Sequence, residues 1–271
     1  MNRSNPWGES PEWREGLPPE ITVHDAAVLR RLVAQAARGG MAAAEVGSWV
    51  GNGSTRVLAE AVRPHGGTLW CIDTWQGSDN VPHHQECRER WGTMFPVFAA
   101  NVRSYGGQEA VRPLAMPSLD ACRLFPDQSL DLVFIDGNHG YSHARADILA
   151  WLPKVRPGGI LCGHDCDADW AALDPRLKAD LGHGREEDTY KNTRWPGPPE
   201  FHAGVVQALH DVLGGRARLW LPDHSTVWSF RKPGGLLRRF LTWLGRPAPS
   251  VGDGPMRAAS PWPAAEAARA R

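Results

Sequence analysis

The sequence predicts an α/β fold with a doubly wound, mostly parallel sheet of seven strands and helices on both faces. From residue 42 onward, apolar runs of strand length alternate with segments of helical periodicity. These runs are continuously apolar, which is typical of parallel strands buried on both faces. Two short runs after residue 216 could pair as an antiparallel hairpin at the C-terminal edge of the sheet.

Each element has a local signal. Residues 24–38, HDAAVLRRLVAQAAR, place apolar side chains at helical spacing, and Gly39 and Gly40 end this helix. Glycine and polar residues separate the segments that follow. The expected strands are 42–47, 67–73, 107–116, 130–136 and 158–165, followed by the hairpin runs 217–223 and 225–232. The expected helices between them are 53–62, 118–125, 141–155 and 202–213.

We expect one main domain at residues 24–232, because a chain of 271 residues is long enough for one large buried core. Residues 1–23 are rich in Pro, Glu and Trp and would form an N-terminal arm. Residues 166–200 have little periodicity and directly follow a strand, so this insertion is placed to cover an active site. Residues 233–271 would form a short amphipathic helix and a flexible tail.

The composition excludes several function classes. Lys plus Arg and Asp plus Glu number 30 each, so no net charge attracts the chain to nucleic acid or to an anionic membrane. Five cysteines at irregular spacings are typical of reduced, intracellular thiols. No stretch reaches the ~18 apolar residues of a membrane span. We therefore expect a cytoplasmic protein with a small-molecule substrate, and a homo-oligomer stays open.

A glycine-rich turn, EVGSWVGNGST, follows the first expected strand, with glycines at Gly47, Gly51 and Gly53. Glycine lets the backbone approach a ligand closely, and the next helix points its N-terminal amides at the same place. A dinucleotide fingerprint would need a small residue where Trp49 stands, so a nicotinamide cofactor is disfavoured. The alternative is a glycine turn without any ligand.

Asp73 ends the second expected strand, 20 residues after Gly53. A carboxylate at this position can accept hydrogen bonds from both ribose hydroxyls of an adenosine. An aspartate at a strand end is also a common cap or turn residue. Together with the glycine turn, Asp73 indicates a nucleoside site.

Two further carboxylates end neighbouring strands. Asp136 ends the fourth expected strand, and His164 and Asp165 end the fifth. Such carboxylates repel each other unless a proton or a cation lies between them. Oxygen ligands favour Mg²⁺, whereas an imidazole ligand from His164 would favour Mn²⁺ or Fe²⁺. The alternatives are that His164 only orients a ligand, and that both aspartates merely cap the helices that follow them.

Four segments together resemble one family of enzymes. They are EVGSWVGNGST, IDTWQGSD, LDLVFIDGNHGYSHARADILAWLPKVRPGGILCGHD and GVVQALHDVLG with TVWSFRK, in that order. They resemble the class I S-adenosylmethionine-dependent methyltransferases with a Rossmann-like fold. Within that class, they are most similar to the bacterial group of metal-dependent sugar and natural-product O-methyltransferases and cephalosporin-hydroxylase-like proteins. The resemblance covers residues 40–232.

The resemblance implies where the cofactor would bind. Gly47 and its neighbour Ser48 would pass close to the amino-acid part of S-adenosylmethionine, and Glu45 would lie near its ammonium group. Asp73 would hold the ribose. Ser118, in AMPSLDA, falls where the family contacts the adenine, although the glycine often found before that serine is missing.

The resemblance also implies catalytic roles. Asp136 would line the cofactor site and would hold a divalent metal ion with Asp165. His164 stands where relatives usually place an acidic ligand. His139, three residues after Asp136, matches a general base of the family's sugar methyltransferases, and an imidazole suits this role near neutral pH. His143 is more consistent with a helix-surface residue.

The resemblance thus predicts an S-adenosylmethionine-dependent O-methyltransferase, metal-assisted, that acts on a sugar or another small natural-product hydroxyl. The oxygen would displace the sulfonium methyl group directly, after alignment and deprotonation by the enzyme. Three alternatives stay open: a nicotinamide-type oxidoreductase, a hydroxylase-like enzyme on the same site, and a non-catalytic S-adenosylmethionine-binding protein.

Overall fold

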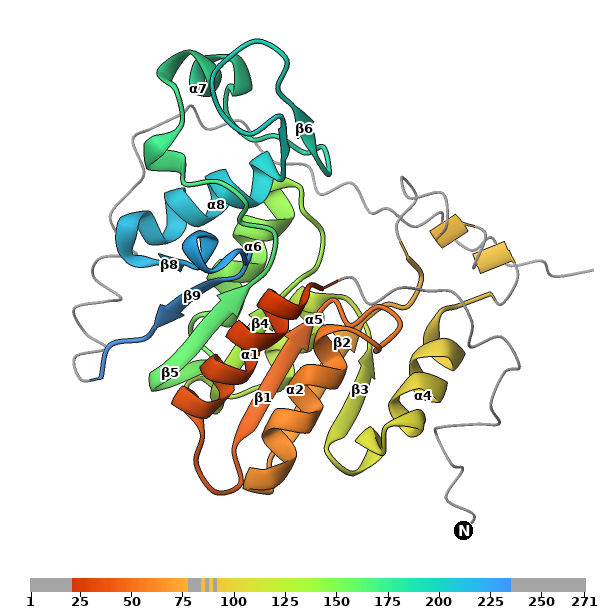
Figure 1. Ribbon diagram of the computed structural model, residues 1–271. Coiled ribbons are helices and arrows are strands. Elements are labelled where there is room, and N and C mark those ends of the chain that lie inside the picture. Colours follow the sequence, from red (N-terminus) through yellow and green to blue (C-terminus); the bar gives the residue numbers. More distant parts are fainter. Residues whose placement is uncertain (1–20, 78–83, 86–87, 90–91, 235–271) are drawn as a thin grey trace, which may run out of the picture. The chain divides into compact units, whose positions relative to one another are not determined.

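The centre of the molecule is a seven-stranded sheet with the strand order β3-β2-β1-β4-β5-β9-β8. Figure 1 shows the computed structural model, which describes residues 21–77, 84, 85, 88, 89 and 92–234. Strands β3 to β5 pair in parallel, and β9 and β8 join the edge antiparallel. The predicted fold class is confirmed, including the hairpin at the edge.

The strands of this sheet are mostly short, and β1, β4 and β9 are largely buried. Their bounds are β1 Ala42–Val46, β2 Thr68–Asp73, β3 Val111–Ala115, β4 Leu130–Ile135, β5 Val155–Gly163, β8 Arg218–Leu219 and β9 Trp228–Arg231. All six residues of β4 are buried, as its continuous apolar run predicts. A separate two-stranded sheet pairs β6 Tyr190–Lys191 with β7 Glu200–Phe201.

Helices cover both faces of the sheet. Their bounds are α1 Val23–Ala36, α2 Ser54–Val62, α4 Phe95–Ser104, α5 Ser118–Ala121, α6 Tyr141–Trp151, α7 Pro175–Leu181 and α8 Ala203–Leu213. Short 3₁₀ turns lie at Arg63–His65, Gly107–Glu109, Cys122–Leu124, Trp170–Ala172, Gly214–Arg216 and Leu221–Asp223. Right-handed crossovers place α2 and α4 on one face and α5 and α6 on the other. In Figure 1, α1 and α2 lie against one face, and α6 packs with α8.

Three details differ from the sequence-based expectations. Helix α4 was not predicted, although Val97, Phe98 and Val102 follow helical spacing and are buried. Strand β5 begins at Val155, earlier than expected, and its pairing with β4 shifts register between Leu130 and Leu132. The segment expected to be irregular, 166–200, contains α7 and one strand of the small sheet.

The register of the strands places their carboxyl ends side by side. The Gly47 amide donates to Ile72, the Asp136 amide to Val46, and the His164 amide to Ile135. Each donor is the first residue after its strand, and each acceptor lies in the neighbouring strand. The ends of β1, β2, β4 and β5 therefore meet at one edge of the sheet, as expected for an α/β ligand site.

Two predicted segments lie outside the described residues, namely most of the N-terminal arm, at 1–20, and almost all of the C-terminal helix and tail, at 235–271. Within the part of the chain that the structure describes, no helix has both the length and the apolar character that a membrane crossing requires.

Candidate active site

Asp73 organises the glycine-rich turn after β1. Its Oδ2 accepts hydrogen bonds from the amides of Ser48 and Trp49 at 3.0 and 2.9 Å, and its Oδ1 accepts one from the Trp75 amide at 2.7 Å. Three of about four acceptor positions are thus used. Burial raises the pKa of Asp73, although these three amide hydrogen bonds oppose the shift. Asp73 can still accept a hydrogen bond from a ligand through Oδ1.

Two glycines of the turn are required by close packing. A Cβ on Gly47, which has φ +84°, would lie 1.8 Å from the carbonyl oxygen of Asp136. A Cβ on Gly51, with φ +70°, would lie 2.7 Å from the ring of Phe98. Trp49 itself has a positive φ of 43°, which is strained for a bulky residue. Gly53 precedes α2, so the free amides of that helix face the turn.

Glu45 lies in β1, directly below this turn, and is completely buried. The Thr55 hydroxyl donates to its Oε2 at 2.6 Å. Its Oε1 and the Ser48 hydroxyl are buried without a hydrogen-bond partner among the described residues. Burial raises the pKa of Glu45 to about 7. Orphaned buried polar atoms are unusual, and a bound ligand with donor groups would satisfy them.

Ser118 begins α5, which follows β3, but its hydroxyl already has partners. It donates to Asp147 Oδ1 at 2.6 Å and accepts a hydrogen bond from the Trp151 indole at 2.8 Å. Both partners belong to α6. The Ser118 side chain therefore joins two helices, and its expected contact with an adenine stays a prediction.

The three predicted metal ligands meet after β4 and β5. His164 Nδ1 lies 3.0 Å from Asp165 Oδ1 and 3.7 Å from Asp136 Oδ1. One ligand atom of each residue lies within 4.8 Å of those of the other two. His164 Nε2 lies 3.4 Å from Asp25 Oδ2. Asp165 has a left-handed backbone conformation with φ 58°, and its carboxylate contacts both His164 and His139.

Asp25 explains how α1 contributes to the site. It accepts hydrogen bonds from the backbone amide and the hydroxyl of Thr22 and from the Ser225 hydroxyl, at 2.6–2.8 Å. Burial alone would raise the pKa of Asp25, but His164 and these donors hold it well below its usual range. The capping box of α1 thus fixes a carboxylate against His164.

His139 joins the same group from the loop before α6. Its Nε2 lies 2.9 Å from Asp165 Oδ2, and its Nδ1 lies 2.7 Å from Asp188 Oδ1. His202, the residue before α8, lies with its ring centroid 4.8 Å from that of His139. His143 is an exposed residue of α6, as expected.

Four members of this group were not predicted from the sequence: Asp25, Asp167, Asp188 and His202. Asp167 and Asp188 belong to the insertion, which has no periodicity that could orient a side chain. His202 directly precedes a predicted helix. In this fold class such a position tends to lie at the end of the sheet, so its place in the sequence could have indicated a site residue. Asp25 stands three residues after Thr22, the spacing of a capping box at the start of a helix.

The protonation of the group is set by mutual pairing. Burial alone would lower the pKa of His139, but Asp165 and Asp188 raise it to about 10. Burial alone would also lower the pKa of His164, but Asp136, Asp165 and Asp25 raise it to about 11. Burial would raise the pKa of Asp165, yet both histidines hold it well below its usual range. Without a metal ion, the positive charges of the protonated histidines compensate the negative charges of the ionised carboxylates.

The donor set of Asp136, His164 and Asp165 fits a divalent cation. Two carboxylates and an imidazole converge, and substrate or water could complete the coordination. The contact between His164 Nε2 and Asp25 resembles the carboxylate that orients a metal-binding histidine from behind. The same edge of the sheet thus offers a glycine turn with Asp73 on one side and a cation-binding group on the other.

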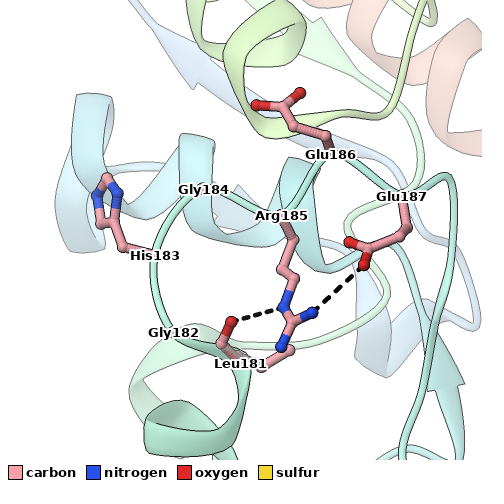
Figure 2. A pocket seen from close by; sticks show the side chains of 7 residues that line it. All are labelled: Leu181, Gly182, His183, Gly184, Arg185, Glu186 and Glu187. Atoms are coloured by element: carbon pink, nitrogen blue, oxygen red, sulfur yellow. Dashed lines mark hydrogen bonds and ion pairs between the residues drawn. The ribbon is translucent and has the colours of Figure 1, made fainter.

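A pocket in the insertion lies outside both groups. Its walls are seven consecutive residues, Leu181 to Glu187 (Figure 2). Arg185 donates to the Leu181 carbonyl and pairs with Glu187. Glu186 accepts hydrogen bonds from the backbone and the side chain of Ser142 in α6. These contacts attach the insertion to α6 and place Asp188 beside His139.

Several solved structures are similar to this chain at low sequence identity. A Corynebacterium glutamicum protein is 16% identical over 80% of this chain and 85% of its own, with a TM-score of 0.49. An O-methyltransferase from Bacillus cereus, solved with S-adenosylhomocysteine, is 14% identical over 80% and 84%, with a TM-score of 0.48. TomG, an O-methyltransferase of tomaymycin synthesis from Streptomyces achromogenes, is 17% identical over 78% and 81%, with a TM-score of 0.47.

The central segment of the chain is similar to known sequences. The uncharacterized protein y4gI of Sinorhizobium fredii is 28% identical over 128 residues, which are 42% of this chain and 13% of that protein. This chain thus spans only a small part of that relative. Residues 44–166, which contain the glycine turn, Asp73, Asp136 and Asp165, match the family model of a methyltransferase domain. By sequence, this segment is therefore similar to a methyltransferase domain, in agreement with the resemblance of its motifs.

Proposed function

We propose that this chain is an S-adenosylmethionine-dependent O-methyltransferase that acts on a sugar or another small natural-product hydroxyl with the help of a divalent metal ion. One observation carries the proposal. Within a matched methyltransferase domain, the glycine turn organised by Asp73 and the group of Asp136, His164 and Asp165 lie on adjacent strand ends of one sheet edge.

The cofactor would lie over the ends of β1 and β2. Asp73 Oδ1 would accept a hydrogen bond from a ribose hydroxyl, since it uses only one acceptor position in the structure. The unpartnered Glu45 Oε1 and Ser48 hydroxyl would serve the amino-acid part. Gly47 and Gly51 would let the backbone approach closely. Trp49 stands at a position where a dinucleotide fingerprint needs a small residue, which disfavours a nicotinamide cofactor.

The metal ion would be held by Asp136, His164 and Asp165. When bound, it would polarise the acceptor hydroxyl and neutralise Asp165, so that this carboxylate no longer raises the pKa of His139. Asp25 would keep the His164 ring in place, because it contacts the ring nitrogen opposite Asp165.

His139 would act as the general base. Asp188 holds its Nδ1, so Nε2 is the nitrogen that faces the strand ends. In the reaction, the acceptor oxygen forms a bond to the methyl carbon, the carbon–sulfur bond breaks, and the sulfur keeps the electron pair as neutral S-adenosylhomocysteine. The hydroxyl proton passes to His139 Nε2. Alignment of oxygen, carbon and sulfur accounts for several kcal/mol of the barrier.

Calorimetry of the full chain with S-adenosylhomocysteine, with and without Mg²⁺ or Mn²⁺, tests cofactor and metal together. We expect S-adenosylhomocysteine to bind and NADH not to bind. Binding of NADH alone would refute the proposal in favour of an oxidoreductase. Methyl transfer to a panel of sugar and polyketide hydroxyls, followed by mass spectrometry, then tests catalysis. Methyl transfer that persists in the presence of a chelator would refute the role of the metal ion. Binding of S-adenosylhomocysteine without methyl transfer to any acceptor would favour a non-catalytic or hydroxylase-like protein.

A further inference from the structure

We propose that His139, Asp165 and His202 form a second cation site, which binds a late divalent transition metal ion such as Co²⁺ or Zn²⁺. This site is distinct from the group of Asp136, His164 and Asp165 and shares only Asp165 with it. One ligand atom from each of the three residues lies within 4.8 Å of those of the other two. His139 Nε2 is 2.9 Å from Asp165 Oδ2, and His202 Nδ1 is 3.8 Å from Asp165 Oδ1.

One histidine of this site, His139, has a carboxylate behind it. Asp188 Oδ1 lies 2.7 Å from His139 Nδ1, so Nε2 remains for a metal ion. Such a partner at the other ring nitrogen is almost always present in metal-binding histidines, because it fixes the tautomer and makes the imidazole a better ligand. Asp167 Oδ2 lies 2.9 Å from His202 Nδ1, the nitrogen that also faces Asp165, and Asp167 Oδ1 accepts from the His202 amide at 3.1 Å. A metal ion on His202 Nδ1 would replace the contact of this nitrogen with Asp167. Neither carboxylate belongs to the first group.

The backbone holds the two histidines together. Gly204, in the first turn of α8, lies so close to the loop before α6 that a Cβ would be 2.3 Å from the His139 carbonyl oxygen and 2.6 Å from the Tyr141 amide. His202 precedes this glycine by two residues, so the close approach of α8 places its ring against that of His139. The site is therefore prearranged by packing, although its residues come from three separate segments.

The chemistry of the donors favours a different ion from the first group. Two imidazoles and one carboxylate suit Fe²⁺, Co²⁺, Ni²⁺ or Zn²⁺ better than Mg²⁺. The side chains of His139, Asp165 and His202 are 23%, 14% and 20% exposed, so an ion can enter and keep open coordination positions. The ion would use the same Nε2 of His139 that a general base needs. On the proposed function, occupancy of this site and deprotonation by His139 therefore exclude each other.

Cobalt titration of the full chain tests the site without cofactor or acceptor. Visible d–d absorption and calorimetry together report the coordination and the number of bound ions. We expect two bound Co²⁺ per wild-type chain. His202→Ala should bind only one Co²⁺ and should lose the d–d absorption of the ion that two imidazoles ligate. Asp136→Ala should lose the other ion and keep that absorption. His210→Ala, on an exposed face of the same helix, serves as the control and should bind both ions.

Two results would overturn the proposal: His202→Ala that binds Co²⁺ like the wild type, or Asp136→Ala that binds none. If His202→Ala unfolds, Asp188→Asn replaces it, and we expect its affinity for this ion to fall by about 10–100-fold, because Asp188 contacts the ring nitrogen of His139 opposite the ligand atom. Unchanged affinity in Asp188→Asn would also contradict the site. A failure of methyl transfer would leave all these results intact, because cobalt binding is measured without the reaction.

Discussion

The pKa values of the buried carboxylates are shifted in opposite directions in the two halves of the sheet edge. At the ends of β1 and β2, burial raises the pKa of Glu45 and Asp73, and their partners are a hydroxyl and backbone amides. At the end of β5, histidines hold the pKa of Asp165 well below its usual range. The first half lacks a cationic side chain among these contacts, whereas the second is built from ion pairs.

This difference shows how one edge can serve two ligands. Fixed amides and hydroxyls do not exchange protons, so the first half is suited to a ligand that brings its own donors, such as ribose hydroxyls and an ammonium group. Imidazoles carry exchangeable protons, so the second half can exchange these protons for a metal ion, or accept one from a substrate once a metal ion has neutralised the carboxylates. The following substitutions test this division.

Asp165→Asn should give the largest effect. Asparagine tolerates the left-handed backbone of this position, so the fold should persist while the charge is lost. We expect methyl transfer to fall by about 10³-fold, because a metal ligand and the partner of the base are removed together. Affinity for S-adenosylhomocysteine, measured by calorimetry, should stay near that of the wild type. Loss of cofactor binding would instead mean that the two halves are not separate.

Glu45→Gln should change the pH dependence of stability. The folded pKa of about 7 lies above the ordinary value of 4.5, so the folded state retains a proton that the unfolded state releases. Wild-type stability should therefore fall as pH rises from 4.5 to 7, by roughly 3 kcal/mol in total. Glu45→Gln should lack this loss in urea unfolding at pH 5 and pH 8. The exposed Glu109→Gln is the control, and equal pH dependence in all three proteins would contradict the buried, protonated acid.

Asp73→Ala should weaken S-adenosylhomocysteine binding by about 100-fold, because the ribose partner and the anchor of the turn are lost together. Binding of Mn²⁺ at the other half of the edge should not change. Calorimetry with each ligand measures both. Unchanged cofactor affinity would refute the ribose assignment, and a parallel loss of Mn²⁺ would show that the halves are coupled.

Asp188→Asn should have the smallest effect, about a tenfold loss of turnover through poorer orientation of His139. Since Asp188 helps to raise the pKa of His139, its loss should also move the ascending limb of the pH–rate profile to lower pH. Glu187→Gln, one position earlier, is the matched control and should leave the profile in place. An unshifted limb in Asp188→Asn would exclude His139 as the base.

The local pattern was sufficient for most of the architecture. Apolar runs and glycine breaks placed all seven strands of the main sheet, and the rule for parallel sheets brought Asp73, Asp136 and Asp165 to one edge. His164 and His139 followed because they adjoin those aspartates in sequence. Helix α4 was missed even though its apolar spacing is helical, since the surrounding residues 74–100 lack regular boundaries.

Tertiary structure alone decided which side chains pair. Asp25, Asp188 and His202 lie 140, 23 and 37 residues from Asp165 in sequence order, on α1, in the insertion and before α8. No periodicity links such positions, because their contacts depend on how helices pack and how loops close. The sequence by itself determined the sheet and the carboxylates at its edge. The partners that set the pKa of those carboxylates became evident only in the folded chain, since pairing at 3 Å requires a precision that spacing along the chain does not carry.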